Sequence, residues 1–198
     1  MKYEMIKDET TKGFLEEFYR IKSLIQIGDV PPGTLGGYIE KPSNLSQEGS
    51  CWVFEGGKIS GNASIQGNAR IYDAQIRGNV RVFGNVVVEK GLIADYCMLY
   101  DNARIINSHV FGNTVICGNS FIDTSHIHEW CSIQGNSQVL YSSISGHTLI
   151  TENANIKSKL VRYGTVTNTL EGIVPCIRHA WNILPIKGVY TFFSIGIY

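Results

Sequence analysis

Aliphatic residues recur in the middle of this chain at intervals of six, six and five positions. Each interval carries one aliphatic residue, and seventeen of these eighteen residues are β-branched. They are Ile65, Ile71, Ile76, Val82, Val88, Ile93, Leu99, Ile105, Val110, Ile116, Ile122, Ile127, Ile133, Val139, Ile144, Ile150, Ile156 and Val161. A small or modest residue, such as Ala63, stands two positions before each one, and only Lys159 breaks that row. Because alternate residues of a strand share one face, the pattern predicts short strands that turn both side chains inward.

The three intervals form a 17-residue unit that is used six times between Gly61 and Arg162. An α-helix, with about 3.6 residues per turn, cannot keep residues six or 17 apart on one stripe. A coil of three short strands can, and Gly, Asn and Asp suit corners where φ is positive. Two further units, 49–54 and 55–60, precede the regular ones, with Cys51, Val53, Gly57 and Ile59 inward. The sequence therefore predicts an all-β fold, a parallel β-helix with 17-residue triangular coils.

The chain divides into three parts on this pattern. Residues 1–43 are expected to form an N-terminal cap, residues 44–162 the β-helix, and residues 163–198 a C-terminal cap or tail with a strand or short helix. Caps are expected because each coil contacts only its neighbours, so the end coils need covers. The last segment, WNILPIKGVYTFFSIGIY, is apolar, but Pro185 and Lys187 interrupt it. We expect it to dock on the core and not to span a membrane.

Charge and cysteine usage narrow the range of partners. Seventeen basic residues balance seventeen acidic ones, which argues against nucleic acid as a partner. The five cysteines are an odd number, and the first residues show no apolar leader. Reduced thiols in a cytoplasmic protein that binds no membrane are the expected state.

The region before the coils carries a family resemblance. The run FYRIKSLIQIGDV, then GTLGGYIE, NLSQEG and CWVF leading into Gly-Asn-Ala units, resembles the YdcK-like family of bacterial and prophage hexapeptide-repeat proteins. The resemblance covers residues 14–162. It implies a left-handed coil, and the wider hexapeptide class is often trimeric, with members labelled as transferases. The left hand is implied by the resemblance alone, and no set of catalytic residues accompanies this family.

Three histidines are the candidate catalytic or metal-binding residues. His109 and His126 are 17 residues apart and should stack on adjacent coils, and His128 lies two residues further along the same strand. The three imidazoles could act as a general base between subunits or bind zinc. The zinc hypothesis resembles one family of β-helical carbonic anhydrases, although the spacing here differs from that family's long-gap pattern. An ordinary outward ladder or a subunit interface is the favoured interpretation.

The acyltransferase hypothesis has a separate requirement. Hexapeptide enzymes that use acetyl-coenzyme A generally have a loop that projects from the coil and encloses the substrate, and between Gly61 and Arg162 no residue is inserted. Cys97 and Cys131 are expected inward, as core residues. We therefore assign no catalytic residue, no metal ligand and no cofactor. Acetyl-coenzyme A or zinc enters only under the alternative hypotheses.

Outward-facing apolar residues give the remaining signal. Two sides of the coil carry them on consecutive turns, and the predicted interface residues are Phe83, Met98, Tyr100, Val115, Phe121 and Ile106. Soluble monomers rarely expose contiguous patches of this kind. A homo-oligomer, a trimer or a dimer, would cover them, and so would a host or phage protein.

The sequence thus predicts a non-enzymatic β-helical scaffold or protein-binding module. If it is encoded by a phage, it would act on a host factor by surface contact. The first alternative is an acyltransferase that uses acyl-coenzyme A at a subunit interface. The second is a metal enzyme built on the histidine cluster.

Overall fold

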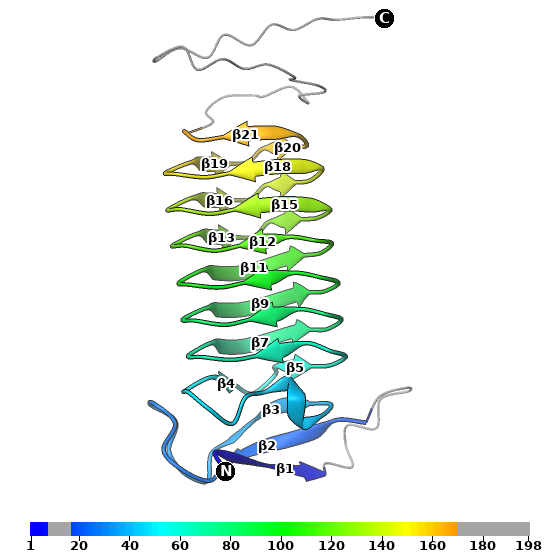
Figure 1. Ribbon diagram of the computed structural model, residues 1–198, viewed down its shortest axis with the longest axis vertical. Coiled ribbons are helices and arrows are strands. Elements are labelled where there is room, and N and C mark those ends of the chain that lie inside the picture. Colours follow the sequence, from blue (N-terminus) through cyan, green and yellow to red (C-terminus); the bar gives the residue numbers. More distant parts are fainter. Residues whose placement is uncertain (8–16, 170–198) are drawn as a thin grey trace, which may run out of the picture.

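The computed structural model describes residues 1–7 and 17–169 of the 198-residue chain. The chain rises from a small N-terminal cap as a left-handed, three-sided parallel β-helix (Figure 1). The predicted all-β fold is confirmed, since the described residues form strands and a short 3-10 helix, η2 (Pro42–Asn44). Residues 170–198, which hold most of the predicted C-terminal cap, lie outside the described residues.

The first side of the column is a seven-stranded parallel sheet built from the first six-residue unit of each coil. Its strands are β6 (Ser64–Ile65), β8 (Arg81–Val82), β10 (Met98–Leu99), β12 (Val115–Ile116), β15 (Trp130–Ile133), β18 (His147–Ile150) and β21 (Gly164–Val166). Partners on adjacent coils are 17 residues apart, as Leu99 and Ile116 are. The predicted repeat length is therefore the register of the sheet.

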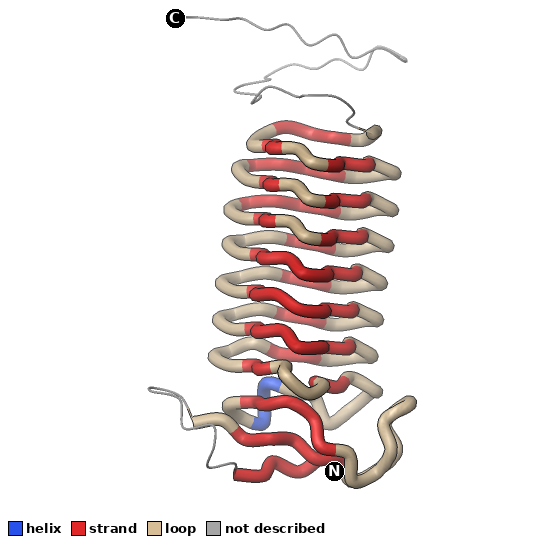
Figure 2. The backbone as a smooth tube through the Cα atoms, turned by 180° about the vertical axis from the view of Figure 1, so that it is seen from behind, coloured by secondary structure: helices blue, strands red, loops and turns tan. Residues whose placement is uncertain are grey.

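The second and third sides belong to one 14-stranded sheet, which also includes the cap. Figure 2 shows these strands stacked above one another from behind. Three long strands cross the edge between the two sides, namely β7 (Arg70–Ile76), β9 (Val87–Ile93) and β11 (Arg104–Val110). The shorter strands are β4 (Trp52–Val53), β5 (Lys58–Ile59), β13 (Phe121–Asp123), β14 (His126–Ile127), β16 (Gln138–Leu140), β17 (Ser143–Ile144), β19 (Asn155–Lys157) and β20 (Leu160–Val161).

The core is the predicted column of branched side chains. All eighteen aliphatic residues are buried, and the most exposed, Val161, has 2% of its surface accessible. Cys51, Val53, Gly57 and Ile59 are buried as well, so both irregular units belong to the coil. Backbone groups pair from coil to coil, since strands of a parallel sheet hydrogen-bond to their neighbours. Side-chain burial and backbone pairing therefore follow the same repeat.

The edges of the column follow from backbone conformation. The first residue of every unit from Gly61 to Ser158 has a φ between 44° and 84°. At the start of the five-residue units none of these residues is glycine, and they include Lys90, Thr124 and Tyr141. A side chain in this left-handed region costs about 1–2 kcal/mol. The stacked neighbours hold these residues in an unfavourable conformation at the shortest corner.

The last described turn is shorter than the others. Trp130 pairs with His147, 17 residues on, but Thr148 pairs with Gly164, which is 16 residues on. The loss of one residue keeps β21 in line, with Val166 above Ile150. Parallel pairing therefore continues to Val166, beyond the last regular unit.

A row of exposed asparagines runs up one edge of the column, at the second position of each second unit. Each side-chain amide donates a hydrogen bond to the amide oxygen of the asparagine on the next coil, at 2.8 to 3.0 Å. The row consists of Asn68, Asn85, Asn102, Asn119, Asn136 and Asn153. Its five bonds all point the same way along the column.

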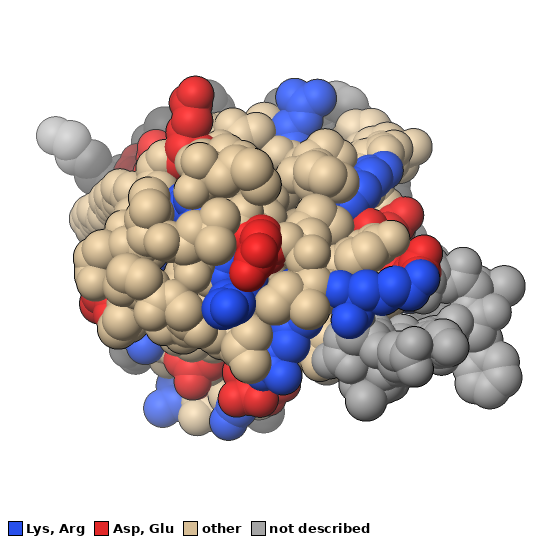
Figure 3. Space-filling view, turned by 90° about the horizontal axis from the view of Figure 1, so that it is seen from below, with Lys and Arg blue, Asp and Glu red and all other residues tan. Residues whose placement is uncertain are grey.

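The cap closes the lower end of the column with strands of opposite direction. β1 (Tyr3–Lys7) and β2 (Tyr19–Ser23) are antiparallel, β2 pairs antiparallel with β3 (Leu35–Ile39), and β3 pairs parallel with β5 of the coil. Seen from below, basic and acidic side chains are interspersed over this end (Figure 3). Charged side chains on a terminal strand discourage pairing with another sheet edge.

Two aromatic residues join the cap to the first coil. Tyr3 and Trp52 are both buried and meet edge to face, with ring centroids 6.5 Å apart. The Tyr3 hydroxyl donates to the Leu45 carbonyl at 2.7 Å. Burial is the main reason why the pKa of Tyr3 rises to about 12. The cap is therefore packed on the coil and does not hang from it.

We expect Gly37→Ala to loosen this junction. A Cβ at Gly37 would lie 2.4 Å from the Gly57 carbonyl oxygen and 2.5 Å from that of Phe54. Forcing a methyl group into such a site typically costs about 1–3 kcal/mol. Urea unfolding should show that loss of stability.

Gly33→Ala is the matched control. Its φ is +83°, but nothing lies within 4 Å of its Cβ position, so only backbone strain of about 1–2 kcal/mol is added. A Gly37→Ala protein as stable as the wild type would contradict the close packing of β3 on the coil.

Candidate functional site

The structure places His109 and His126 together on the third side of the column. They lie on β11 and β14 at paired positions, and their ring centroids are 5.0 Å apart with planes at 87°. His109 also meets Phe111 edge to face, at 6.1 Å. Both histidines are exposed. The predicted stacking of these two residues is confirmed.

His128 makes a different contact. Its Nδ1 lies 3.6 Å from Oε1 of Glu129, the next residue, around the corner of the coil. In the described part of the chain, no group of three or more His, Cys, Asp or Glu side chains is arranged to hold a metal ion. His109 and His126 could supply two imidazoles to a metal, and a third ligand would have to come from elsewhere. The catalytic role of the cluster remains a prediction.

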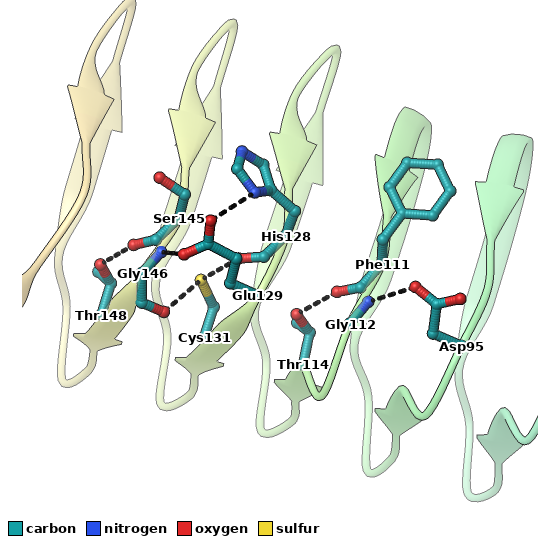
Figure 4. Close-up of polar contacts among 10 residues, drawn as sticks. All are labelled: Asp95, Phe111, Gly112, Thr114, His128, Glu129, Cys131, Ser145, Gly146 and Thr148. Carbon is teal, nitrogen blue, oxygen red and sulfur yellow. Dashed lines mark hydrogen bonds and ion pairs between the residues drawn. The ribbon is translucent and has the colours of Figure 1, made fainter.

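The polar contacts around His128 repeat along the column, as Figure 4 shows. The Thr114 hydroxyl donates to the Phe111 carbonyl at 2.8 Å, and the Thr148 hydroxyl donates to the Ser145 carbonyl at 2.6 Å. In the turn between them, the Cys131 thiol donates to the His128 carbonyl at 3.1 Å. The same bond therefore closes three successive turns, two of which lack a histidine at that place.

Glu129 also has a structural partner. Its Oε2 accepts a hydrogen bond from the Gly146 amide at 2.7 Å, and Asp95 accepts one from Gly112 at 2.9 Å in the same way (Figure 4). In both cases an acidic residue at a corner binds the corner glycine of the next coil. Glu129 is thus held in the repeat and is not a carboxylate reserved for His128.

The apolar residues of the first side form one continuous surface, which we call the aromatic patch: Phe83, Met98, Tyr100 and Val115. The rings of Phe83 and Tyr100 are stacked with planes at 1° and centroids 5.1 Å apart. Phe83 is 37% exposed, and the other three residues are half-buried. A hydrogen bond with the Cys117 side chain is the main reason why the pKa of Tyr100 is raised. This neighbour accounts for the low exposure, 7%, of a cysteine that was expected to face outward.

The second side carries the other two predicted interface residues. Ile106 and Phe121 are half-buried and lie on adjacent coils. Below them a shallow depression, open to solvent, is lined by Tyr72, Val87, Glu89 and Arg104. A depression that opens this widely does not enclose a small substrate.

One surface feature was missed in the sequence. Trp130, 59% exposed, stacks on His147 with ring centroids 6.1 Å apart and planes at 20°. Both occupy the second position of the first unit, where Asn62 and Asn79 stand in lower coils. That row changes from amide to ring side chains, and this change was the available signal.

The thiols of the coil are core residues, as expected. Cys97 and Cys131 are buried, and burial is the main reason why their pKa values rise to about 12 and about 11. A protonated thiol is a weak nucleophile, because the thiolate is the reactive form. Neither cysteine is placed for nucleophilic catalysis.

Comparison with known proteins gives a partial match. No family model matches this chain. Over 90 residues, 44% of the chain, it is 34% identical to the "Uncharacterized acetyltransferase YdcK" of Escherichia coli (strain K12). The chain spans 27% of that protein's length. The resemblance to YdcK-like hexapeptide-repeat proteins is confirmed by this match and by the fold.

A search for membrane-crossing helices gave a negative result within residues 1–7 and 17–169. No helix there is long and apolar enough to cross a bilayer.

The raised thiol pKa values predict how stability changes at alkaline pH. The thiols of Cys97 and Cys131 stay protonated in the folded protein up to about pH 12 and about pH 11, whereas unfolded thiols ionise near 9.0. This contribution to stability is therefore complete below pH 9.0 and is lost as the pH rises through that window. Urea midpoints measured from pH 8 upward should fall.

The double variant Cys97→Ala, Cys131→Ala should show a flatter decline over the same range. Its absolute stability will be lower because of the lost side-chain volume, so the slopes are to be compared. Equal slopes in the two proteins would show that these thiols do not titrate on unfolding as described.

Proposed function

We propose that this chain is a non-enzymatic β-helical scaffold that assembles with a second copy of itself through the aromatic patch. The observation that carries the proposal is the stacked pair Phe83 and Tyr100, with Met98 and Val115, on an otherwise regular wall. Apolar patches that continue over several coils mark protein contact sites.

The chemistry of the patch favours a second copy as its occupant. None of its four residues is charged, so two copies of the patch can meet without burying an unpaired charge. The chain has no formal net charge at pH 7, so two copies do not repel one another strongly. Closed symmetric pairing of like surfaces is the commonest form of assembly.

The shape of the walls supports a scaffold over an enzyme. From Gly61 to Arg162 no loop projects from the column, and the described polar residues near the histidines serve the corners of the coil. Catalysis on two substrates requires that they be held and shielded from water. A flat β-sheet side offers little of either.

The cellular location belongs to the same proposal. The four cysteines of the described residues are free, which fits a reducing cytoplasm. A cytoplasmic protein of bacterial or phage origin that acts by contact, on itself or on a host factor, is consistent with that chemistry.

A second candidate function is acyl transfer. It is favoured by the name of the similar Escherichia coli protein and by the exposed pair His109 and His126, either of which could act as a general base. In this case acetyl-coenzyme A would bind between subunits, beside the third side of the column.

We expect the double variant Phe83→Asp, Tyr100→Asp to lose self-association. Each carboxylate would have to be buried without a partner in the contact, which is strongly unfavourable. Light scattering coupled to size exclusion should report an oligomer for the wild type and a monomer for the variant.

Phe121→Asp, on the second side, is the matched control and should keep the wild-type mass. Dissociation by Phe121→Asp alone would move the contact to the second side. A wild-type protein that is monomeric at tens of micromolar would overturn self-assembly and leave another protein as the occupant.

Calorimetry with acetyl-coenzyme A and with zinc tests the enzyme hypotheses. The scaffold proposal predicts no saturable binding of either, since neither the described histidines nor the depression encloses a ligand. Micromolar binding that is lost in His126→Ala and kept in His147→Ala would overturn the proposal in favour of an active site on the third side.

A further inference from the structure

Lys2 is a buried lysine at the lower end of the column, just before β1. Only 3% of its surface is exposed. Its Nζ donates to the carbonyl oxygens of Cys51 at 3.0 Å and Glu48 at 3.2 Å, with that of Gly49 at 3.5 Å. The fourth partner is the Cys51 thiol, whose Sγ lies 3.2 Å from Nζ.

The surroundings of this ammonium group are unusual. Within the described residues no carboxylate lies at ion-pair distance from Lys2, and its partners are neutral carbonyls and one thiol. A buried charge without a counter-charge is unfavourable even when it is hydrogen-bonded. A reaction that removes this charge in place would therefore be favoured by the site.

The thiol partner differs from the other buried thiols of the coil. Cys51 is completely buried, as Cys97 and Cys131 are. Cys97 and Cys131 contact only carbonyl oxygens, at 3.0 and 3.1 Å in their shorter bonds. Cys51 also has carbonyl oxygens nearby, but it alone of the described cysteines has an amine nitrogen against its sulfur.

We propose that Lys2 and Cys51 are a modification site, at which dioxygen joins the two side chains through a single bridging oxygen. The Lys2 ammonium first gives up a proton to water. The S–H bond of Cys51, one N–H bond of the Lys2 amine and the O–O bond of dioxygen then break. One oxygen atom bonds to both Sγ and Nζ, and the other leaves as water with the two hydrogen atoms. Sulfur and nitrogen each lose two electrons, and dioxygen gains the four.

The geometry favours this product over other oxidised forms of the thiol. The two atoms that must be joined are already in contact, so the side chains need only a small approach. The bridge is neutral and replaces a buried cation. Dioxygen is small, and segments at the end of a chain open locally more readily than the core of a coil does.

The bridge would fasten the cap to the first coil. Residues 2 and 51 are far apart in sequence, and the backbone of Lys2 is already held by Gln47, whose Oε1 accepts from its amide at 2.7 Å. A covalent link there restricts the unfolded chain as a disulfide does. The oxidised protein should therefore unfold at a higher temperature than the reduced one.

Peptide mapping by mass spectrometry tests the proposal on the full chain. One sample is incubated in dioxygen-saturated buffer, and a second is kept under a phosphine reductant. The expected result is a joined peptide containing Lys2 and Cys51 that is heavier than its two parts by one oxygen and lighter by two hydrogens. It should disappear on reduction, and Cys97 and Cys131 should remain free thiols.

Two variants serve as controls. Lys2→Arg keeps the charge and the donors but lacks the reactive amine, and Cys51→Ser keeps a small polar group, so neither should give the joined peptide or the rise in unfolding temperature. Because the main measurement is made on the wild type, a variant that folds poorly does not remove the test.

Two results would overturn the inference. One is a folded, oxidised protein in which Cys51 carries its own oxygens while Lys2 stays free. The other is a joined peptide without the additional oxygen, which would show a direct sulfur–nitrogen bond.

Discussion

The packing of one branched aliphatic side chain above another is the interaction on which this molecule depends. Ile105 lies over Val88 and under Ile122, and the same relation repeats on all three sides. Backbone hydrogen bonds between coils form only if every coil returns to the same place, and the buried column brings it there. The strain of side chains in the left-handed region at Lys90, Thr124 and Tyr141 is accepted because this packing outweighs it.

The repeat made the coil predictable from sequence, because burial and period are both visible in the letters. The corners were predictable too, since their composition reflects the positive φ. The contacts of the cap were not, because Lys2 and Cys51 belong to no repeat and meet only after the chain has folded back. The exposure of outward residues also depends on the neighbouring side chain, as the burial of Cys117 beside Tyr100 shows.

The same limit applies to the candidate site. Spacing alone placed His109 and His126 on adjacent coils, because residues 17 apart must stack. It could not show that the corner turns His128 toward Glu129, since that depends on side-chain conformation. The stacked pair Trp130 and His147 was missed because exposed rings leave no trace in a pattern of buried residues. What an outer surface does is therefore harder to read than how the core is built.

The row of asparagines has a consequence for the length of each turn. Every amide from Asn68 to Asn153 is both donor and acceptor, so each holds its place only if the coils above and below have the same length up to that edge. A turn that gained or lost a residue before the edge would move its amide out of line and break two bonds. The 16-residue turn comes after the last amide of the row, where a change of length leaves the gauge intact. The column thus carries along its outside a ruler against which insertions are measured.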